Sequence, residues 1–429
     1  MLAETLEQIQ SSPSKRTTYV RFVLAALAAI VLVKTFWFAR WGAWQHRELA
    51  DFDAFHIVAQ RVWLGDLDQV YRLETLTKLQ MEASGGLKVM PWTYPPQFEL
   101  LLAPFAFLPV GIAYLLFMAG TLAFYLVTLR SIAGINFAQV LVILFPALAI
   151  TIGSGQNGFL TGALIGVVCF QVQRRKMSAD VLAGLALGAM VIKPHLAIAA
   201  AFYLLATRRW VAIATAAMLV LASSLACTLV FGPQIWIAWL GAIRESASYL
   251  DQGFYPLFRM ISSYAALYMA GVPATGAFWG QAVVAGLAMC AVVLGIFPGA
   301  QREASAAFAL GITAMVSVML SPYAYDYDLP MLGIGLGLLL SDLGRLAGAR
   351  ERSVMYGLIL LAGAYGLLQS ARMAAQYGTE AHYAPAVAGL ALMALLALLL
   401  RILLRKARPV RATSPRSEAA EGLPQSHGS

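Results

Sequence analysis

The chain has 429 residues, of which 60% are hydrophobic and only 12% are charged, a composition that excludes an ordinary soluble globular domain. Its net charge of +9 comes from basic residues in short loops and near both ends. This distribution is typical of membrane proteins whose basic loops stay in the cytoplasm, so we expect no nucleic-acid partner.

The apolar residues form runs of about 17–25, the length that a helix needs to cross a hydrocarbon layer of about 30 Å. The ten-residue alternation of a transmembrane barrel is not seen. Because helices satisfy their own backbone hydrogen bonds in lipid, the sequence predicts an all-α polytopic membrane protein. The cysteines lie in separate apolar segments, which predicts neither a disulfide framework nor a zinc site: Cys169, Cys227 and Cys290.

Residues 1–19 are polar and are predicted to form a cytoplasmic N-terminal segment, followed by a first span over about 20–38. A long polar outer loop is expected over about 39–97. The helical spacing of its apolar residues predicts a short helix on the membrane surface. An aromatic belt is expected where the first span leaves the membrane: Trp37, Trp41 and Trp44.

The remaining apolar runs complete a transmembrane domain over 20–404, with a second outer loop at about 232–275 and a basic, disordered cytoplasmic tail at 405–429. The run 179–206 is interpreted as two short spans that meet at Lys193-Pro194-His195, because proline breaks the helix there. The other spans are expected at about 98–129, 137–152, 159–172, 211–231, 276–297, 304–320, 329–341, 354–369 and 385–404. The first of these runs is broken at Pro104 and at Pro109-Val110-Gly111.

This topology, with both ends in the cytoplasm, brings the conspicuous polar segments to one outer face. They are Asp51 to His56, Gln156-Asn157, Lys193 to His195, and Asp326 to Asp328. Ionisable residues in membrane segments are costly and usually functional, so the outer face is where chemistry is expected.

Several short motifs share their order with a known family. They are Asp51-Phe52-x-x-Phe55, Tyr94-Pro95-Pro96, Gly155-Gln156-Asn157, Lys193-Pro194-His195, and Ser321-Pro322-x-x-Tyr325-Asp326-Tyr327-Asp328. Together they resemble glycosyltransferase family 87, which belongs to the GT-C type of integral-membrane transferases. Two positions depart from the family pattern: Phe55 replaces a tyrosine, and Asp326 to Asp328 stand where better-known members carry histidines.

The apolar runs predict about twelve transmembrane helices, and the resemblance implies that they form a GT-C-like bundle with short surface helices in its extracytoplasmic loops. It also implies a hexosyltransferase that moves mannose or another hexose, with inversion, from a polyprenyl-phosphate donor to a lipid or glycan acceptor. The reaction is expected at the extracytoplasmic face of a bacterial inner membrane. No metal or other cofactor is expected, because the leaving group is a phosphate monoester.

The family pattern makes Asp51 the general base, with Asp53 as the alternative. A different interpretation is that Asp51 caps the surface helix. Lys193 with His195, and Arg259 in the second outer loop, are predicted to bind the donor phosphate. Lys193 could instead reach lipid headgroups. Residues predicted to contact the sugar or acceptor, unless they only cap or turn helices, are Tyr94, Gln156, Asn157, Asp326 and Asp328.

Two other functions fit the same composition. One is a lipid or solute transporter or flippase, in which ionisable residues would be distributed through the depth of the membrane. The other is an oligosaccharide ligase or polymerase that uses a diphosphate-linked donor.

Overall fold

The computed structural model describes residues 2–41, 49–84, 90–251, 255–297, 305–375 and 384–405. In these residues the protein is helical, with one isolated β-bridge between Met260 and Tyr325 and no longer strand. The predicted all-α fold is therefore confirmed. The tail from residue 406 onward lies outside the described residues. So do Trp44 and the side chain of Trp41, which belong to the predicted aromatic belt.

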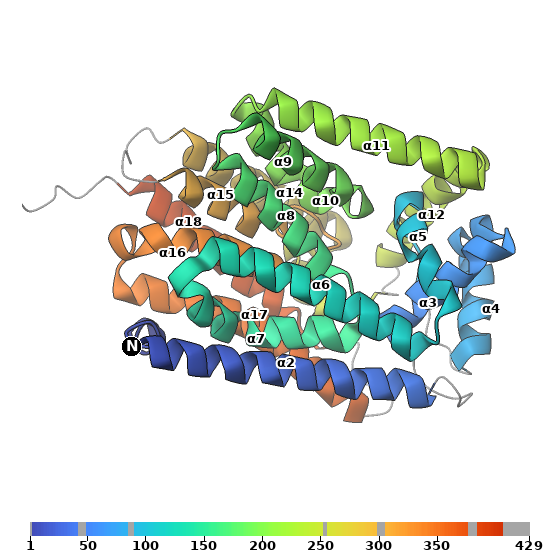
Figure 1. Cartoon of the computed structure of the whole chain (residues 1–429), viewed down its shortest axis with the longest axis horizontal. Coiled ribbons are helices and arrows are strands. Elements are labelled where there is room, and N and C mark those ends of the chain that lie inside the picture. The colour runs from blue at the N-terminus through green and yellow to red at the C-terminus, as the bar shows by residue number, and fades with distance from the viewer. Residues whose placement is uncertain are drawn as a thin grey trace, which may run out of the picture.

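Long helices run side by side along the long axis of the molecule (Figure 1). They are α2 (Pro13–Trp41), α6 (Val110–Ala133), α7 (Phe137–Ser154), α11 (Trp210–Phe231), α14 (Ala274–Ile296), α16 (Pro330–Leu346), α17 (Ala349–Ala375) and α18 (Val387–Leu404). Shorter helices pack among them: α8 (Gly158–Val172), α9 (Met177–Ala189), α10 (Pro194–Ala206) and α15 (Ala306–Ser317). Short α1 (Leu2–Glu7) lies at the left-hand end in Figure 1.

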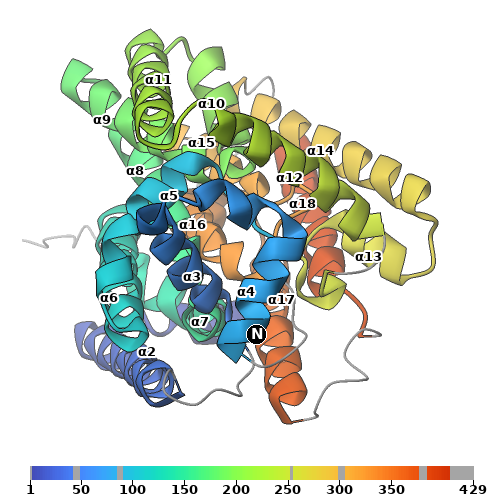
Figure 2. The ribbon, with the colours of Figure 1, turned by 90° about the vertical axis from the view of Figure 1, so that its right-hand side faces the viewer.

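A separate layer of short elements covers the opposite end of the bundle, which we call the site end (right in Figure 1, facing the viewer in Figure 2). It contains α3 (Asp51–Leu64), η1 (Leu67–Tyr71), α4 (Leu73–Ser84), α5 (Pro96–Leu102), η2 (Ala103–Phe107) and α12 (Gln234–Asp251). Three further turns follow in the chain: η5 (Leu257–Arg259), α13 (Ser263–Met269) and η6 (Asp326–Asp328). The helix predicted after the first span is confirmed as α3, and its position on the membrane surface stays a prediction.

Six helical stretches of the described chain are long and apolar enough to cross a membrane, and four shorter apolar helices accompany them. The protein is therefore a multi-pass membrane protein. Each predicted span overlaps one of these helical stretches or, in one case, α17. The number of helices that cross the membrane stays a prediction.

The second span was predicted to begin at residue 98, and this is wrong. Residues 96–107 form α5 and η2, which pack against α3, and the spanning helix α6 begins only at Val110. Pro109 occupies the N-cap of α6, and Pro104 lies in the first turn of η2. Because proline has no N–H group to donate, these positions interrupt one long helix and place its first part in the outer layer.

The helices separate into an outer ring and a core. In the most apolar 18 residues of each helix, only 22% of α2 and 17% of α11 is buried inside the protein. The corresponding share is 72% for the stretches 110–154 and 326–346. Large side chains such as Phe22 and Leu229 are 74% and 77% exposed. In water such surfaces would aggregate, whereas hydrocarbon solvates them, so α2 and α11 face lipid and α7 and α16 form the core.

The helices that carry the site are too short to reach the full depth of the bundle. Arg209, just before α11, contacts Asp180 on α9 (Nη1–Oδ1 3.3 Å), so both helices start at the same end. With 13 residues in α9 and three in η4 (Met190–Ile192), this path rises about 24 Å, whereas the 22 residues of α11 rise about 33 Å. The chain then turns at Lys193 and returns as α10, which confirms the predicted break. Lys193 therefore lies recessed by about 9 Å from the far end of α11.

Gly158 permits the close approach of η6 to the start of α8. A methyl group at this position would overlap the carbonyl oxygen of Tyr327, which is backbone and cannot rotate away. We expect Gly158→Ala to destabilise the protein by about 3 kcal/mol or more, the upper range for overpacking. Thermal unfolding of the detergent-purified protein measures this. Gly153→Ala is the control, because its added methyl meets nothing within 4 Å; equal melting temperatures for the two variants would contradict the prediction.

Candidate active site

The two acidic residues at the start of α3 have different environments. The Asp53 carboxylate is 4% exposed and accepts a hydrogen bond from the Ala50 backbone N–H (2.8 Å), as a residue in a helix capping box does. The Asp51 carboxylate instead faces Arg259, with 3.7 Å between Oδ2 and Nη1. The capping role that was the alternative for Asp51 therefore belongs to Asp53, and Asp51 remains available for chemistry.

Arg259 joins Asp51 to a second carboxylate. Its Nε and Nη2 donate to the two oxygens of Asp326 at 3.1 and 3.0 Å, a bidentate pair. The side chains of Arg259 and Asp51 are 16% and 17% exposed, whereas that of Asp326 is 1% exposed. The guanidinium is thus anchored from behind and presents its remaining edge to Asp51.

A second ion pair lies beside the first. The Lys193 ammonium donates to Asp328 Oδ1 at 2.8 Å, and the two side chains are 7% and 1% exposed. Asp328 Oδ2 also accepts from the Tyr325 backbone N–H (3.1 Å), which fixes the carboxylate at the start of η6. We call Asp51, Lys193, Arg259, Asp326 and Asp328 the charged cluster.

The ring of Tyr327 contacts both cations. Its ring centroid lies 4.6 Å from Lys193 Nζ and 5.6 Å from Arg259 Cζ, within the range of cation–π attraction. The ring stacks on Tyr325 at 5.1 Å with an interplanar angle of 9°. The Asp-Tyr-Asp turn thus supplies a carboxylate to each cation and an aromatic face to both.

The protonation of the residues outside the spans follows from their neighbours. Burial lowers the pKa of Arg259, but the Asp326 and Asp51 carboxylates outweigh it and the net pKa is raised, so the guanidinium stays charged. Burial, with the charges of Asp328 and Asp51, raises the pKa of Tyr94 well above its ordinary value. Tyr94 therefore keeps its hydroxyl proton, and its hydroxyl hydrogen-bonds Gln156 Oε1 at 3.0 Å.

Two predicted contact residues have buried polar atoms without a hydrogen-bond partner among the described residues. Both amide atoms of Asn157 are in this state, and so is Nε2 of His195. Leaving such groups unpaired costs about 1–3 kcal/mol each, so both are suited to a polar ligand. The structure thus brings the predicted residues around one place, with Tyr94 5.9 Å from Lys193 (ring centroid to Nζ).

Asp326 and Asp328 were predicted to contact the sugar or the acceptor, and this stays a prediction. Both carboxylates are 1% exposed and face a cation. Contact with a sugar is untested, but their burial favours a role behind Arg259 and Lys193.

Sequence reasoning overlooked Tyr327 and Glu99. Glu99 is fully buried and accepts from Trp92 Nε1 at 2.8 Å, and the Trp92 ring contacts that of Tyr94 (centroids 5.0 Å apart). Burial raises the pKa of Glu99 to about 8, so its carboxyl is mostly protonated at neutral pH. The available signal was a single acid at the start of an apolar run, three residues after the end of Tyr94-Pro95-Pro96.

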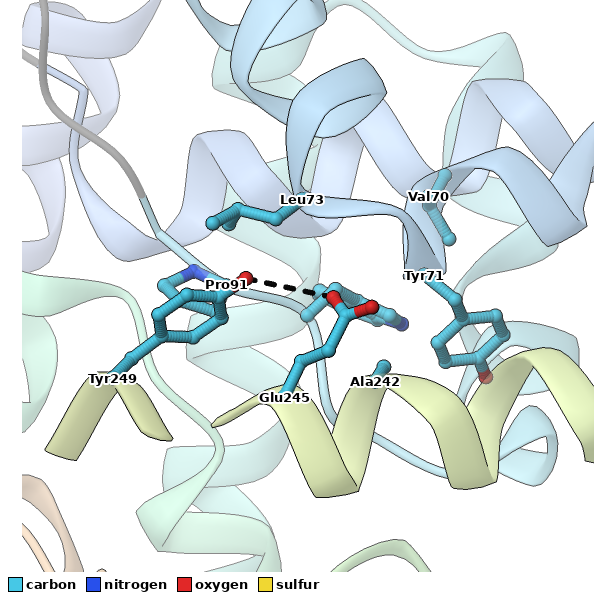
Figure 3. Close-up of a pocket in the computed structure, with 8 residues that line it drawn as sticks. Val70, Tyr71, Leu73, Pro91, Ala242, Glu245 and Tyr249 are labelled. Carbon is cyan, nitrogen blue, oxygen red and sulfur yellow. Dashed lines mark hydrogen bonds between the residues drawn. The ribbon is translucent and has the colours of Figure 1, made fainter. Parts of the chain in front are cut away.

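A small, partly open pocket adjoins this region at the site end (Figure 3). Its lining includes Tyr71 and Trp92, together with Glu245 and Tyr249 of α12. The Tyr249 hydroxyl lies 3.5 Å from Glu245 Oε2 (Figure 3). The Tyr71 hydroxyl donates to the Tyr94 carbonyl (3.0 Å), which connects the pocket wall to Tyr94, beside the charged cluster.

Carboxylates and cations gathered at one end of a membrane-helix bundle define a membrane protein with a site suited to group transfer. The sequence model of glycosyltransferase family 87 matches residues 92–322, more than half of the chain. The chain therefore belongs to glycosyltransferase family 87, which confirms the resemblance drawn from the motifs. Lys193 and Arg259 lie inside the matched residues, whereas Asp51 precedes them and Asp326 and Asp328 follow them.

Two other comparisons complete the picture. No curated protein matches the chain. The crystal structure of ArnT from Cupriavidus metallidurans bound to undecaprenyl phosphate is similar over 90% of this chain and 78% of that chain, with 14% identity and a TM-score of 0.35. That likeness is too weak to transfer any property to this chain.

Proposed function

We propose that this membrane glycosyltransferase moves mannose or another hexose from a polyprenyl-phosphate donor to a lipid or glycan acceptor. The observation that supports it is the charged cluster, in which a carboxylate and two cations meet in one recessed place. Asp51 accepts the proton of the acceptor hydroxyl. The oxygen of that acceptor hydroxyl forms the new bond to the anomeric carbon while the bond from that carbon to the phosphate oxygen breaks.

The leaving polyprenyl phosphate takes the electron pair of the broken bond. Lys193 and Arg259 stabilise the charge that develops on it, as cations placed in advance do in a site of low dielectric. Attack from the side opposite the phosphate inverts the anomeric centre. Asn157 and His195 hydrogen-bond the sugar or the phosphate with the polar atoms that otherwise lack partners.

The proposed orientation puts the site end at the extracytoplasmic face of a bacterial inner membrane. Exposed basic residues cluster at the opposite end, where Arg209 Nη2 contacts the Val172 carbonyl (2.9 Å). Positive loops favour the cytoplasmic side, which supports this orientation. The residues concerned are Arg174, Arg175, Lys176 and Arg208.

The direct test incubates the purified protein in lipid nanodiscs with polyprenyl-phosphate-mannose or polyprenyl-phosphate-glucose and an extract of bacterial lipids as acceptor. Mass spectrometry of the lipids is expected to show a hexose-bearing product and free polyprenyl phosphate. Transfer only from a diphosphate-linked oligosaccharide would overturn the proposed donor in favour of a ligase or polymerase.

Chelation supplies a second expected result. Because two protein cations can neutralise a phosphate monoester, we expect the initial rate to be unchanged when EDTA is added. A rate lost with EDTA and restored by Mg²⁺ or Mn²⁺ would contradict the metal-independent mechanism.

A further inference from the structure

We propose that Asp326 is a positioning residue that fixes Arg259 for the donor phosphate and keeps it from pairing tightly with Asp51. This inference rests on the proposed roles of Asp51 as base and Arg259 as phosphate ligand. It gives Asp326 a role other than contact with the sugar.

The geometry of Arg259 is asymmetric. Its Nε and Nη2 edge makes two hydrogen bonds of 3.1 and 3.0 Å to Asp326, while Nη1 stays 3.7 Å from Asp51, too far for a hydrogen bond. A guanidinium binds a carboxylate best through two parallel N–H donors. Asp326 therefore occupies the stronger binding edge and leaves Nη1 for the phosphate.

The backbone brings Arg259 and Asp326 together in a fixed register. The Met260–Tyr325 bridge is antiparallel, and the Ile261 N–H donates to the Ala324 carbonyl at 2.9 Å. In this antiparallel register the residue before Met260 lies opposite the residue after Tyr325, so Arg259 pairs with Asp326. Their contact is therefore a consequence of two short segments that pair across the site.

Gly366 on α17 makes room for the Asp326 carboxylate. A methyl group there would lie 2.9 Å from Asp326 Oδ2 and 3.1 Å from its Cβ, both closer than ordinary contacts. Asp326 is thus held between the Arg259 guanidinium and the surface of a helix. At 1% exposure its carboxylate is shielded from substrate and acts only through Arg259.

Without Asp326, the bidentate edge of Arg259 has Asp51 as its nearest carboxylate. A tight Arg259–Asp51 pair would occupy the base and draw the cation away from the phosphate. Both the chemical step and donor binding would then suffer, so kcat should fall and the donor KM should rise.

A double-mutant cycle tests this dependence. We expect Asp326→Asn and Arg259→Gln each to lower kcat/KM for the donor by about a hundredfold, and the double variant to be no worse than Arg259→Gln alone. Losses that multiply in the double variant would overturn the positioning role. Wild-type kcat/KM in Arg259→Gln would instead overturn the proposed phosphate ligand.

A second pair of variants avoids leaving a buried cation unpaired, which by itself destabilises a protein. Gly366→Ala keeps every charge but displaces the Asp326 carboxylate, and we expect about a tenfold loss of kcat/KM. Gly357→Ala on the same helix is the matched control, because its nearest neighbour, Leu2, would be 4.0 Å from the methyl. Equal activity of the two variants, at equal melting temperatures, would overturn the inference.

Discussion

Replacing Asp51 by asparagine is expected to lower sugar transfer by at least about a hundredfold, the usual contribution of a positioned general base. The amide keeps the size of the side chain but cannot accept the acceptor proton. Asp51 is 17% exposed and does not serve the capping hydrogen bond of α3, so the variant should fold normally. Turnover of a polyprenyl-phosphate-hexose donor by purified protein measures the effect.

Asp53→Asn is the matched control two residues away. Its amide oxygen can still accept the Ala50 N–H, which is the bond that Asp53 makes in the capping box of α3. We expect its turnover to remain close to that of the wild type. If Asp53→Asn is the inactive variant and Asp51→Asn is active, the assignment of the base must be reversed.

Replacing Lys193 by methionine is expected to cost about 3–5 kcal/mol of stability, because it leaves the Asp328 carboxylate buried without its cation. The lysine is 7% exposed and the aspartate 1%. The same variant should lose donor binding, since one of the two proposed phosphate ligands is gone. Thermal unfolding and a donor titration measure the two effects separately.

The double variant Lys193→Met with Asp328→Asn separates these two roles of the lysine. It removes both charges, and the asparagine oxygen can still accept from the Tyr325 N–H. We expect most of the lost stability to return while activity remains absent. Activity that returns with stability would show that Lys193 has only a structural role.

Prolines and polar residues inside apolar runs are the signals from which helix breaks could be predicted in this sequence. Pro194 fixed the break between α9 and α10, because a proline inside a continuous helix would remove a hydrogen bond. The same logic was ambiguous at Pro104 and Pro109, where the chain could kink or start a new element. In the structure a new element begins there, because α5 and η2 pack on α3. One of these contacts is the hydrogen bond that Trp63 Nε1 donates to the Ala103 carbonyl (2.8 Å).

The pairing inside the charged cluster could not be predicted. Arg259 and Asp326 are 67 residues apart in the chain, and Lys193 and Asp328 are 135 apart. Motif order placed these residues at one end of the bundle, but the choice of partner depends on the register of η5 and η6. That register follows from the β-bridge and from the close approach at Gly158, neither of which has a local signature.

The recessed turn at Lys193 has a consequence for the acceptor. A proposed transfer centre about 9 Å below the end of α11 lies deeper than the lipid headgroups, because α11, at about 33 Å, is only slightly longer than the hydrocarbon layer of about 30 Å is thick. A donor phosphate can enter at that depth while its prenyl tail stays dissolved among acyl chains. The hydroxyl that attacks must descend to the same level. This favours an acceptor that is itself anchored in the leaflet, or a slender glycan end, over the surface of a bulky folded glycoprotein.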